Sequence, residues 1–132
     1  SRNNNVVEEI RDLTNGGVDY AIDLAGVIQA MDTAYQIIRY GGSVVTAGLS
    51  PINTQFSFNH SDLVAQEKSI LGSYMGSCVP VRDVPRFLNL YKQGRLPVDK
   101  LIDGKITFDN LNEGFDKLSK GEVVRQILIP NV

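Results

Sequence analysis

The sequence predicts an α/β fold, built around a mainly parallel sheet that is flanked by helices. Short strand-like apolar runs alternate with segments of helical periodicity along the chain. The run SVVTAGL at 43–49 is nearly continuous in small and β-branched residues, which is typical of a strand covered on both faces. Turns at Gly26 and Gly48 end two of the three main strands, where parallel sheets bind their ligands. Glycine there permits either the close approach of a ligand or an ordinary tight turn, and the spacing leaves both interpretations open.

The first elements are predicted from periodicity. Apolar side chains recur at helical spacing over 6–13, with Asn5 as a candidate N-cap, so we expect a helix there. A strand over 18–26 follows. A second helix is expected from Ile28 onward, and the pair Gly41 and Gly42 is expected to end it.

For the middle of the chain, the sequence predicts a polar loop at 50–55, a short helix at 61–66 and a third strand at 68–75. A longer helix follows, with Val84, Phe87, Leu88 and Tyr91 expected to face inward and Pro85 expected near its start. For the last third of the chain, the sequence predicts a strand at 105–108, a helix capped by Asp109 and a final strand at 124–129.

Composition excludes several classes of protein. The 132 residues are 42% hydrophobic and 21% charged, with a formal net charge of −2, which indicates a folded domain and no electrostatic preference for nucleic acid. No apolar run approaches the ~20 residues that a membrane-spanning helix needs. The polar start, residues 1–5, is not a signal peptide, and it lacks an initiating Met, which suggests part of a longer protein. A cytoplasmic location is expected.

No complete active site can be identified from chemistry alone. The chain has no GxGxxG turn and no GKS or GKT phosphate loop. Its single histidine, His60, lies in a polar loop, and its single cysteine, Cys78, has no base beside it in the sequence. Asp23 is placed at the end of a strand, where we expect it to bond to nearby backbone.

Several segments in a fixed order carry a resemblance. The most specific is FDNLNEGFDKLSKGEVVRQIL at 108–128, and the others are VDYAIDLAG at 18–26, GG at 41–42, SVVTAGL at 43–49, EKSILGSYMGS at 67–77 and LYKQGRLPVDKLI at 90–102. Together they resemble the C-terminal part of zinc-type medium-chain alcohol dehydrogenases.

The resemblance implies the second half of a Rossmann-type parallel sheet over residues 1–98. Residues 99–132 would then be a tail that returns to the catalytic domain. In this family the glycine-rich turn, the ribose-binding acid and the zinc ligands precede such a segment. NAD is the cofactor expected, with NADP left open because the deciding residues belong to that preceding part. The substrate would be an alcohol, oxidised to an aldehyde or ketone.

The resemblance also implies cofactor contacts. One turn would follow the adenosine or pyrophosphate side, a second would face the nicotinamide, and main-chain groups of a third would bond the carboxamide. An arginine would reach the phosphates, because a guanidinium offers a planar charged fork to phosphate oxygens. In that order, these residues are Leu24, Ala25, Gly26 and Val27; Ala47, Gly48 and Leu49; Ser73, Tyr74 and Met75; and Arg125.

Two further expectations follow from the family. The strand 68–75 would pair with its mate in a homodimer, and the chain alone would be inactive as a dehydrogenase. Two alternatives remain: a zinc-free quinone or enoyl reductase of the same fold, and a non-catalytic α/β interaction module.

Overall fold

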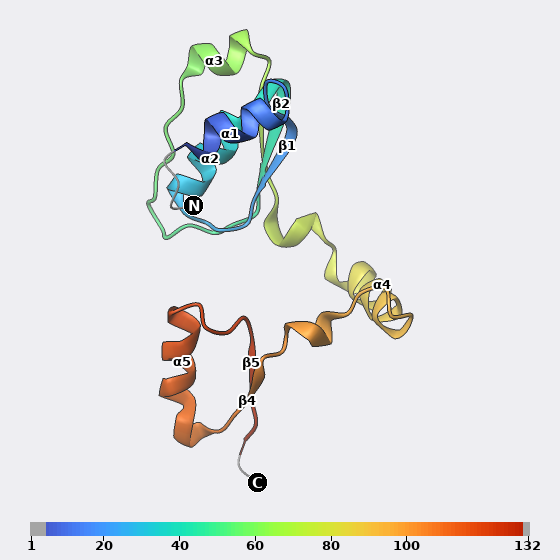
Figure 1. Ribbon diagram of the computed structural model, residues 1–132. Helices are drawn as coiled ribbons and strands as arrows, with labels where there is room; N and C mark the ends of the chain where they lie inside the picture. Colours follow the sequence, from blue (N-terminus) through green and yellow to red (C-terminus); the bar gives the residue numbers. More distant parts are fainter. Residues whose placement is uncertain (1–4, 131–132) are drawn as a thin grey trace. The chain divides into compact units, whose positions relative to one another are not determined.

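The computed structural model describes residues 5–130, which fall into two compact units (Figure 1). The first unit ends at Cys78 and the second begins at Val79. No helix in residues 5–130 has the length and apolar character that crossing a membrane requires.

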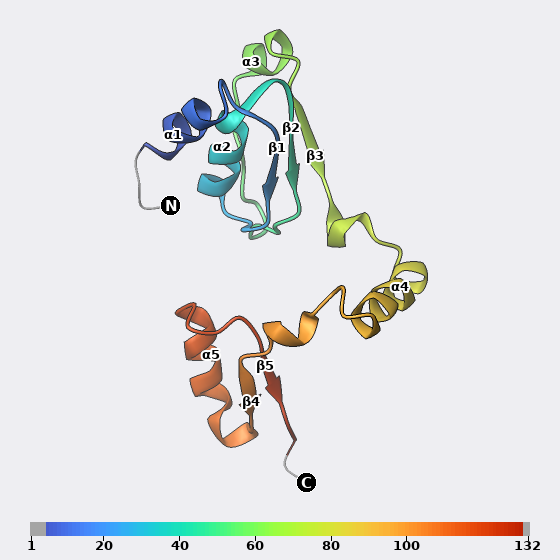
Figure 2. The ribbon, with the colours of Figure 1, turned by 45° about the vertical axis from the view of Figure 1, so that its right-hand side comes forward.

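The first unit is an α/β layer with a three-stranded sheet. The strand order is β1-β2-β3, and both pairs are parallel. Helix α2 packs against β1 and β2, and α1 packs against α2 (Figure 2). The elements are α1 (Val6–Leu13), β1 (Val18–Asp23), α2 (Ile28–Ile37), β2 (Ile38–Thr46), α3 (His60–Ala65), β3 (Ser69–Gly72) and the 3₁₀ turn η1 (Tyr74–Ser77).

The core of this unit lies between α2 and the sheet. Side chains alternate along β1, so that Ala21 faces the core while Tyr20 and Ile22 are exposed on the other face. The buried hydrophobic residues come from the sheet and from α2: Ala21, Met31, Ala34, Tyr35, Ile38 and Val44.

The boundary between α2 and β2 corrects one prediction. The glycine pair at 41–42 does not end the helix, which stops at Ile37, and both glycines lie within β2. Ile38 already pairs with Val18, and the register shifts before Tyr20 pairs, so the residues after Ile38 form an irregularity in the strand. A side chain at Gly42 would lie 2.9 Å from the Arg39 carbonyl oxygen, which explains a glycine at that position.

The second unit contains a β-α-β arrangement. Strands β4 and β5 are parallel, and α5 connects them. The elements are α4 (Pro80–Lys92), η2 (Val98–Leu101), β4 (Gly104–Ile106), η3 (Phe108–Asn110), α5 (Leu111–Ser119) and β5 (Gln126–Leu128).

Three predictions for this unit are corrected. Pro85 lies inside α4 and not near its start. The N-cap position of α5 is Asn110, not Asp109, and the capping box of Thr107 and Asn110 belongs to the preceding turn η3. The α4 side chains expected to face inward remain 42–54% exposed: Val84, Phe87, Leu88 and Tyr91.

Candidate functional site

The carboxyl ends of the three parallel strands meet at one edge of the first unit. Asp23 pairs with Thr46, and Thr46 pairs with Gly72, so the three strands end level with one another. The segments 24–27, 47–49 and 73–75 continue from these three ends. Ten of the eleven cofactor-binding residues predicted from the sequence are therefore gathered at one edge of the sheet.

Asp23 joins the first two of these segments. Its buried carboxylate accepts hydrogen bonds from the Ala25 backbone N–H at 3.0 Å and from the Thr46 hydroxyl at 2.9 Å. Its backbone carbonyl accepts from the N–H groups of Ala47 at 2.8 Å and Gly48 at 3.2 Å. The prediction of a strand-end acid bonded to nearby backbone is confirmed.

The two glycine turns are in direct backbone contact. A Cβ added to Gly48 would lie 2.1 Å from the Gly26 nitrogen, a distance that no side chain can occupy. Gly26 has φ +67°, and a Cβ there would lie 2.6 Å from the Leu49 carbonyl oxygen. The Ser50 hydroxyl donates to the Gly26 carbonyl at 2.8 Å. These glycines are therefore required by the packing of one turn on the other.

A hollow of about 400 Å³ lies beyond the ends of β2 and β3. Its volume falls within the range of about 300–1,000 Å³ that is typical of small-molecule sites. The Ser73 N–H donates to the Thr46 carbonyl at 2.9 Å, so the segment after β3 is held against β2. The residues that line the hollow are Thr46, Ala47, Gly48, Leu49, Gly72, Ser73 and Tyr74.

The predicted cofactor-binding residues form two groups, those that line this hollow and those that do not. Five of them line it, and Thr46 and Gly72, which the sequence reasoning missed, line it as well. Their only signal in the sequence is that each is the last residue of a strand. Met75 lies outside the lining, in a left-handed turn (φ +49°) that also includes Ser77 (φ +54°). The predicted residues that do not line the hollow are Leu24, Ala25, Gly26, Val27, Met75 and Arg125.

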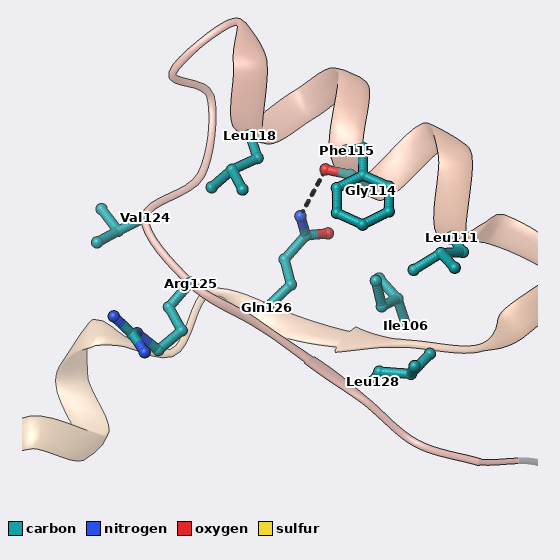
Figure 3. A pocket seen from close by; sticks show the side chains of 9 residues that line it. All are labelled: Ile106, Leu111, Gly114, Phe115, Leu118, Val124, Arg125, Gln126 and Leu128. Carbon is teal, nitrogen blue, oxygen red and sulfur yellow. Dashed lines mark hydrogen bonds between the residues drawn. The ribbon is translucent and has the colours of Figure 1, made fainter. Parts of the chain in front are cut away.

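Arg125 belongs to the second unit and directly precedes β5. Its side chain is exposed and extends away from α5, on the opposite side of the chain from Gln126 (Figure 3). It faces a hollow of about 480 Å³ whose lining also includes Tyr91, Asp99 and Ile127. The prediction that places Arg125 within a strand is wrong, because β5 begins one residue later.

The other face of β5 lines an apolar cavity of about 430 Å³ beneath α5 (Figure 3). The Gln126 side-chain amide crosses this cavity and donates to the Gly114 carbonyl at 2.8 Å. Gly114 is buried, and a Cβ there would lie 2.8 Å from Ile106 Cδ1. Gly114 is therefore a position at which α5 packs closely on β4.

The opposite end of the first unit holds two cations with a structural role. Arg11 donates to the Gln36 carbonyl at 3.0 Å, and Lys68 donates to the Tyr35 carbonyl at 3.3 Å, so both complete the last turn of α2. Burial, and then the charge of Arg11, lower the pKa of the Lys68 ammonium, which lies 4.7 Å from the centre of the Tyr35 ring.

Residues 5–130 do not provide a metal site, because this part of the chain contains no group of three or more His, Cys, Asp or Glu side chains placed to share an ion. His60 and Cys78 are thus not part of such a group.

Comparison with known proteins places this geometry in a class. Residues 1–93 match the family described as zinc-binding dehydrogenase, and the chain belongs to this family. The predicted resemblance to zinc-type medium-chain alcohol dehydrogenases is confirmed, and so is the α/β fold of parallel strands flanked by helices.

Particular relatives agree with this assignment. Alcohol dehydrogenase 1 of Cenchrus americanus is 33% identical over 127 residues, which cover 96% of this chain and 33% of the relative. The structure of benzyl alcohol dehydrogenase from Acinetobacter calcoaceticus matches with a TM-score of 0.87 at 27% identity. The match covers 98% of this chain and 36% of the benzyl alcohol dehydrogenase chain. Another match is a Sinorhizobium meliloti 1021 protein described as a putative zinc-binding dehydrogenase bound to NADP, with a TM-score of 0.72 at 26% identity. This match covers 89% of this chain and 33% of the Sinorhizobium chain. The chain thus spans about a third of the length of these relatives.

Proposed function

We propose that this chain supplies part of the cofactor site of a nicotinamide-dependent alcohol dehydrogenase. The observation that carries the proposal is the hollow formed by backbone turns at the level ends of β2 and β3. Turns of this kind present main-chain N–H and C=O groups to a flat polar ring without intervening side chains. The bound nicotinamide would accept the hydride that an alcohol loses on oxidation.

Each predicted residue has a role in this proposal. Residues 47–49 line the nicotinamide end through their backbone, and main-chain groups of residues 73–75 bond the carboxamide. Residues 24–27 lie along the adenosine or pyrophosphate side, where contact with the turn at Gly48 fixes their position. Arg125 binds the phosphates. NAD is the proposed cofactor, and NADP is the alternative that the Sinorhizobium relative illustrates.

A catalytic zinc is proposed only for the whole protein. Because residues 5–130 offer no cluster of metal ligands, zinc ligands would have to come from other residues. We therefore expect the 132-residue chain alone to form no NADH from NAD and an alcohol above the background absorbance change at 340 nm. Turnover by the chain alone would contradict this division of roles.

The remaining proposals concern the protein in its surroundings. We infer a homodimer that forms through the edge strand β3 and a location in the cytoplasm. Nucleic acid and membrane are not expected as partners, because the formal net charge is only −2.

Titration of the ¹⁵N-labelled chain with NADH, followed by the backbone amide signals, tests the cofactor site. We expect the largest shift changes at Gly48, Leu49 and Tyr74. The variant Tyr74→Ala should weaken binding because Tyr74 lines the hollow. Tyr20→Ala is the matched control, since both tyrosines are 70% exposed and Tyr20 lies on the face of β1 outside the hollow.

The proposal fails if NADH leaves all three amide signals unmoved. It also fails if both tyrosine variants lose affinity equally, because the binding surface would then not be the hollow.

A further inference from the structure

We propose that Asp103 is a positioning residue for Arg125: its carboxylate holds the Arg125 peptide so that the guanidinium faces outward to receive a dinucleotide phosphate. The inference rests on the proposed function of Arg125. It adds a residue whose sequence position, before the short strand β4, gives no sign of a role in cofactor binding.

The geometry is that of a clamp on the backbone of one residue, Arg125. Asp103 Oδ2 accepts hydrogen bonds from the N–H of Val124 and from the N–H of Arg125, the latter at 3.0 Å. In return, the Asp103 N–H donates to the Arg125 carbonyl at 2.8 Å. Both polar backbone groups of Arg125 are therefore bonded to Asp103.

This clamp is needed because Arg125 lies just outside the strand. Strand β5 begins at Gln126 and pairs with β4 over only three residues, so the ladder does not include Arg125. The N–H groups of two successive residues meet one carboxylate oxygen, and hydrogen bonds to an ionised acceptor are the strong ones. The same contacts lower the pKa of the Asp103 carboxyl, so it stays ionised at neutral pH.

The clamp leaves the Arg125 side chain available. Among residues 5–130 the guanidinium has no ion pair or hydrogen bond to another side chain, and it extends away from α5 (Figure 3). Side-chain direction alternates along an extended chain, so fixing the peptide of Arg125 fixes the side to which its side chain points. The Gln126 side chain reaches into the apolar cavity beneath α5, whose lining also includes Arg125.

A pre-oriented arginine loses less conformational freedom when it binds phosphate. We therefore expect loss of the clamp to weaken dinucleotide binding by about three- to tenfold, the range that corresponds to ordering one long side chain. Binding of nicotinamide mononucleotide, which lacks the pyrophosphate bridge, should change less.

The test measures dissociation constants of the full 132-residue chain for NADH and for nicotinamide mononucleotide, together with thermal midpoints. Asp103→Ala removes the acceptor, and Asp103→Asn restores an oxygen that can accept the same N–H groups. Gln126→Ala is the matched control, because it removes a side-chain bond at the neighbouring residue on the other side of the strand. Arg125→Ala reports the contribution of the guanidinium itself.

Support for the inference requires a defined pattern. Asp103→Ala must weaken NADH binding more than mononucleotide binding, Asp103→Asn must recover most of the loss, and Gln126→Ala must leave the affinity for NADH unchanged at a comparable loss of thermal stability. If Asp103→Ala does not fold, Asp103→Ser, which also removes the carboxylate but keeps a polar side chain, takes its place in the same comparison.

The opposing outcomes are separable. If Arg125→Ala weakens NADH binding while Asp103→Ala does not, the inference is wrong and the proposed function stands. If Asp103→Ala and Gln126→Ala weaken NADH binding equally, Asp103 is merely structural. If the unaltered chain does not bind NADH, the proposed function fails and the inference fails with it.

Discussion

Asp23 connects two turns through a single buried side chain. Its carboxylate bonds the Ala25 N–H and the Thr46 hydroxyl, and the site depends on these turns keeping their places. Replacement by alanine leaves a part-buried N–H without its acceptor, which costs about 1–3 kcal/mol. We expect Asp23→Ala to lower the free energy of unfolding by that amount in urea denaturation.

The matched control for this residue is Asp23→Asn. Its amide oxygen can still accept from the Ala25 N–H, so the loss of stability should be clearly smaller than that of Asp23→Ala. Equal losses for the two variants would show that charge, and not the hydrogen bond to Ala25, is what stabilises the turn.

Gly48 tests the contact between the turns. A methyl group there would lie 2.1 Å from the Gly26 nitrogen, so Gly48→Ala must force the turns apart. Overpacking of this kind costs about 1–3 kcal/mol or more. Gly72→Ala is the control, since its Cβ would meet nothing within 4 Å. We expect Gly48→Ala to lower the thermal midpoint and Gly72→Ala to leave it nearly unchanged, and similar midpoints for both would refute the contact.

At the scale of elements, the β4–β5 pair depends on an ionised carboxylate. The N–H groups of Arg125 and then Val124 lower the pKa of Asp103 in the folded state below its unfolded value of 3.8. Its stabilising contribution is therefore fully present above that value and is lost as the pH falls through the lower, folded pKa. We expect stability in urea to decline below about pH 4, and less steeply in Asp103→Asn. A variant with the same acid decline as the parent chain would contradict this role.

The order of helices and strands was predictable from the sequence, because apolar residues recur at helical spacing in the helices α1 and α2 and form short runs in the strands. The boundary at Ile37 was not, because it depends on pairing between Val18 and Ile38, which are 20 residues apart in sequence. The glycines at 41–42 resemble the end of a helix in the sequence, but they lie within the irregular part of strand β2. Likewise, the apolar residues of α4 could be recognised in the sequence, but their exposure in the structure could not.

The site was predictable only in part. Glycines after strands mark turns, and the resemblance supplied their roles, so Gly48, Leu49 and Tyr74 could be proposed as cofactor contacts, and they line the hollow. The contacts of Asp103 were missed because they are three backbone hydrogen bonds to residues more than 20 positions away. A single carboxylate carries no pattern that spacing could reveal.

At the scale of the whole molecule, β1 and β3 are the edge strands of the three-stranded sheet formed within residues 5–130. The proposed homodimer pairs β3 with its two-fold mate, which satisfies the unpaired N–H and C=O groups of that edge. Leu71→Lys should weaken the dimer, because like charges would then meet across the two-fold axis. Ile22→Lys on β1 is the control. Light scattering at micromolar concentration checks both, and a strict monomer of the unaltered chain would rule out this pairing.

The contact between Gly26 and Gly48 has a consequence for directed evolution of this site. The two loops are in backbone contact at these glycines, so a side chain at either glycine would disturb both loops. A library that randomises 24–27 and 47–49 independently would therefore consist mostly of unfolded members. Holding both glycines constant, with Asp23 and Thr46 beside them, leaves Leu24, Val27 and Leu49 free to vary. Useful diversity in cofactor affinity should therefore be sought at those three exposed side chains.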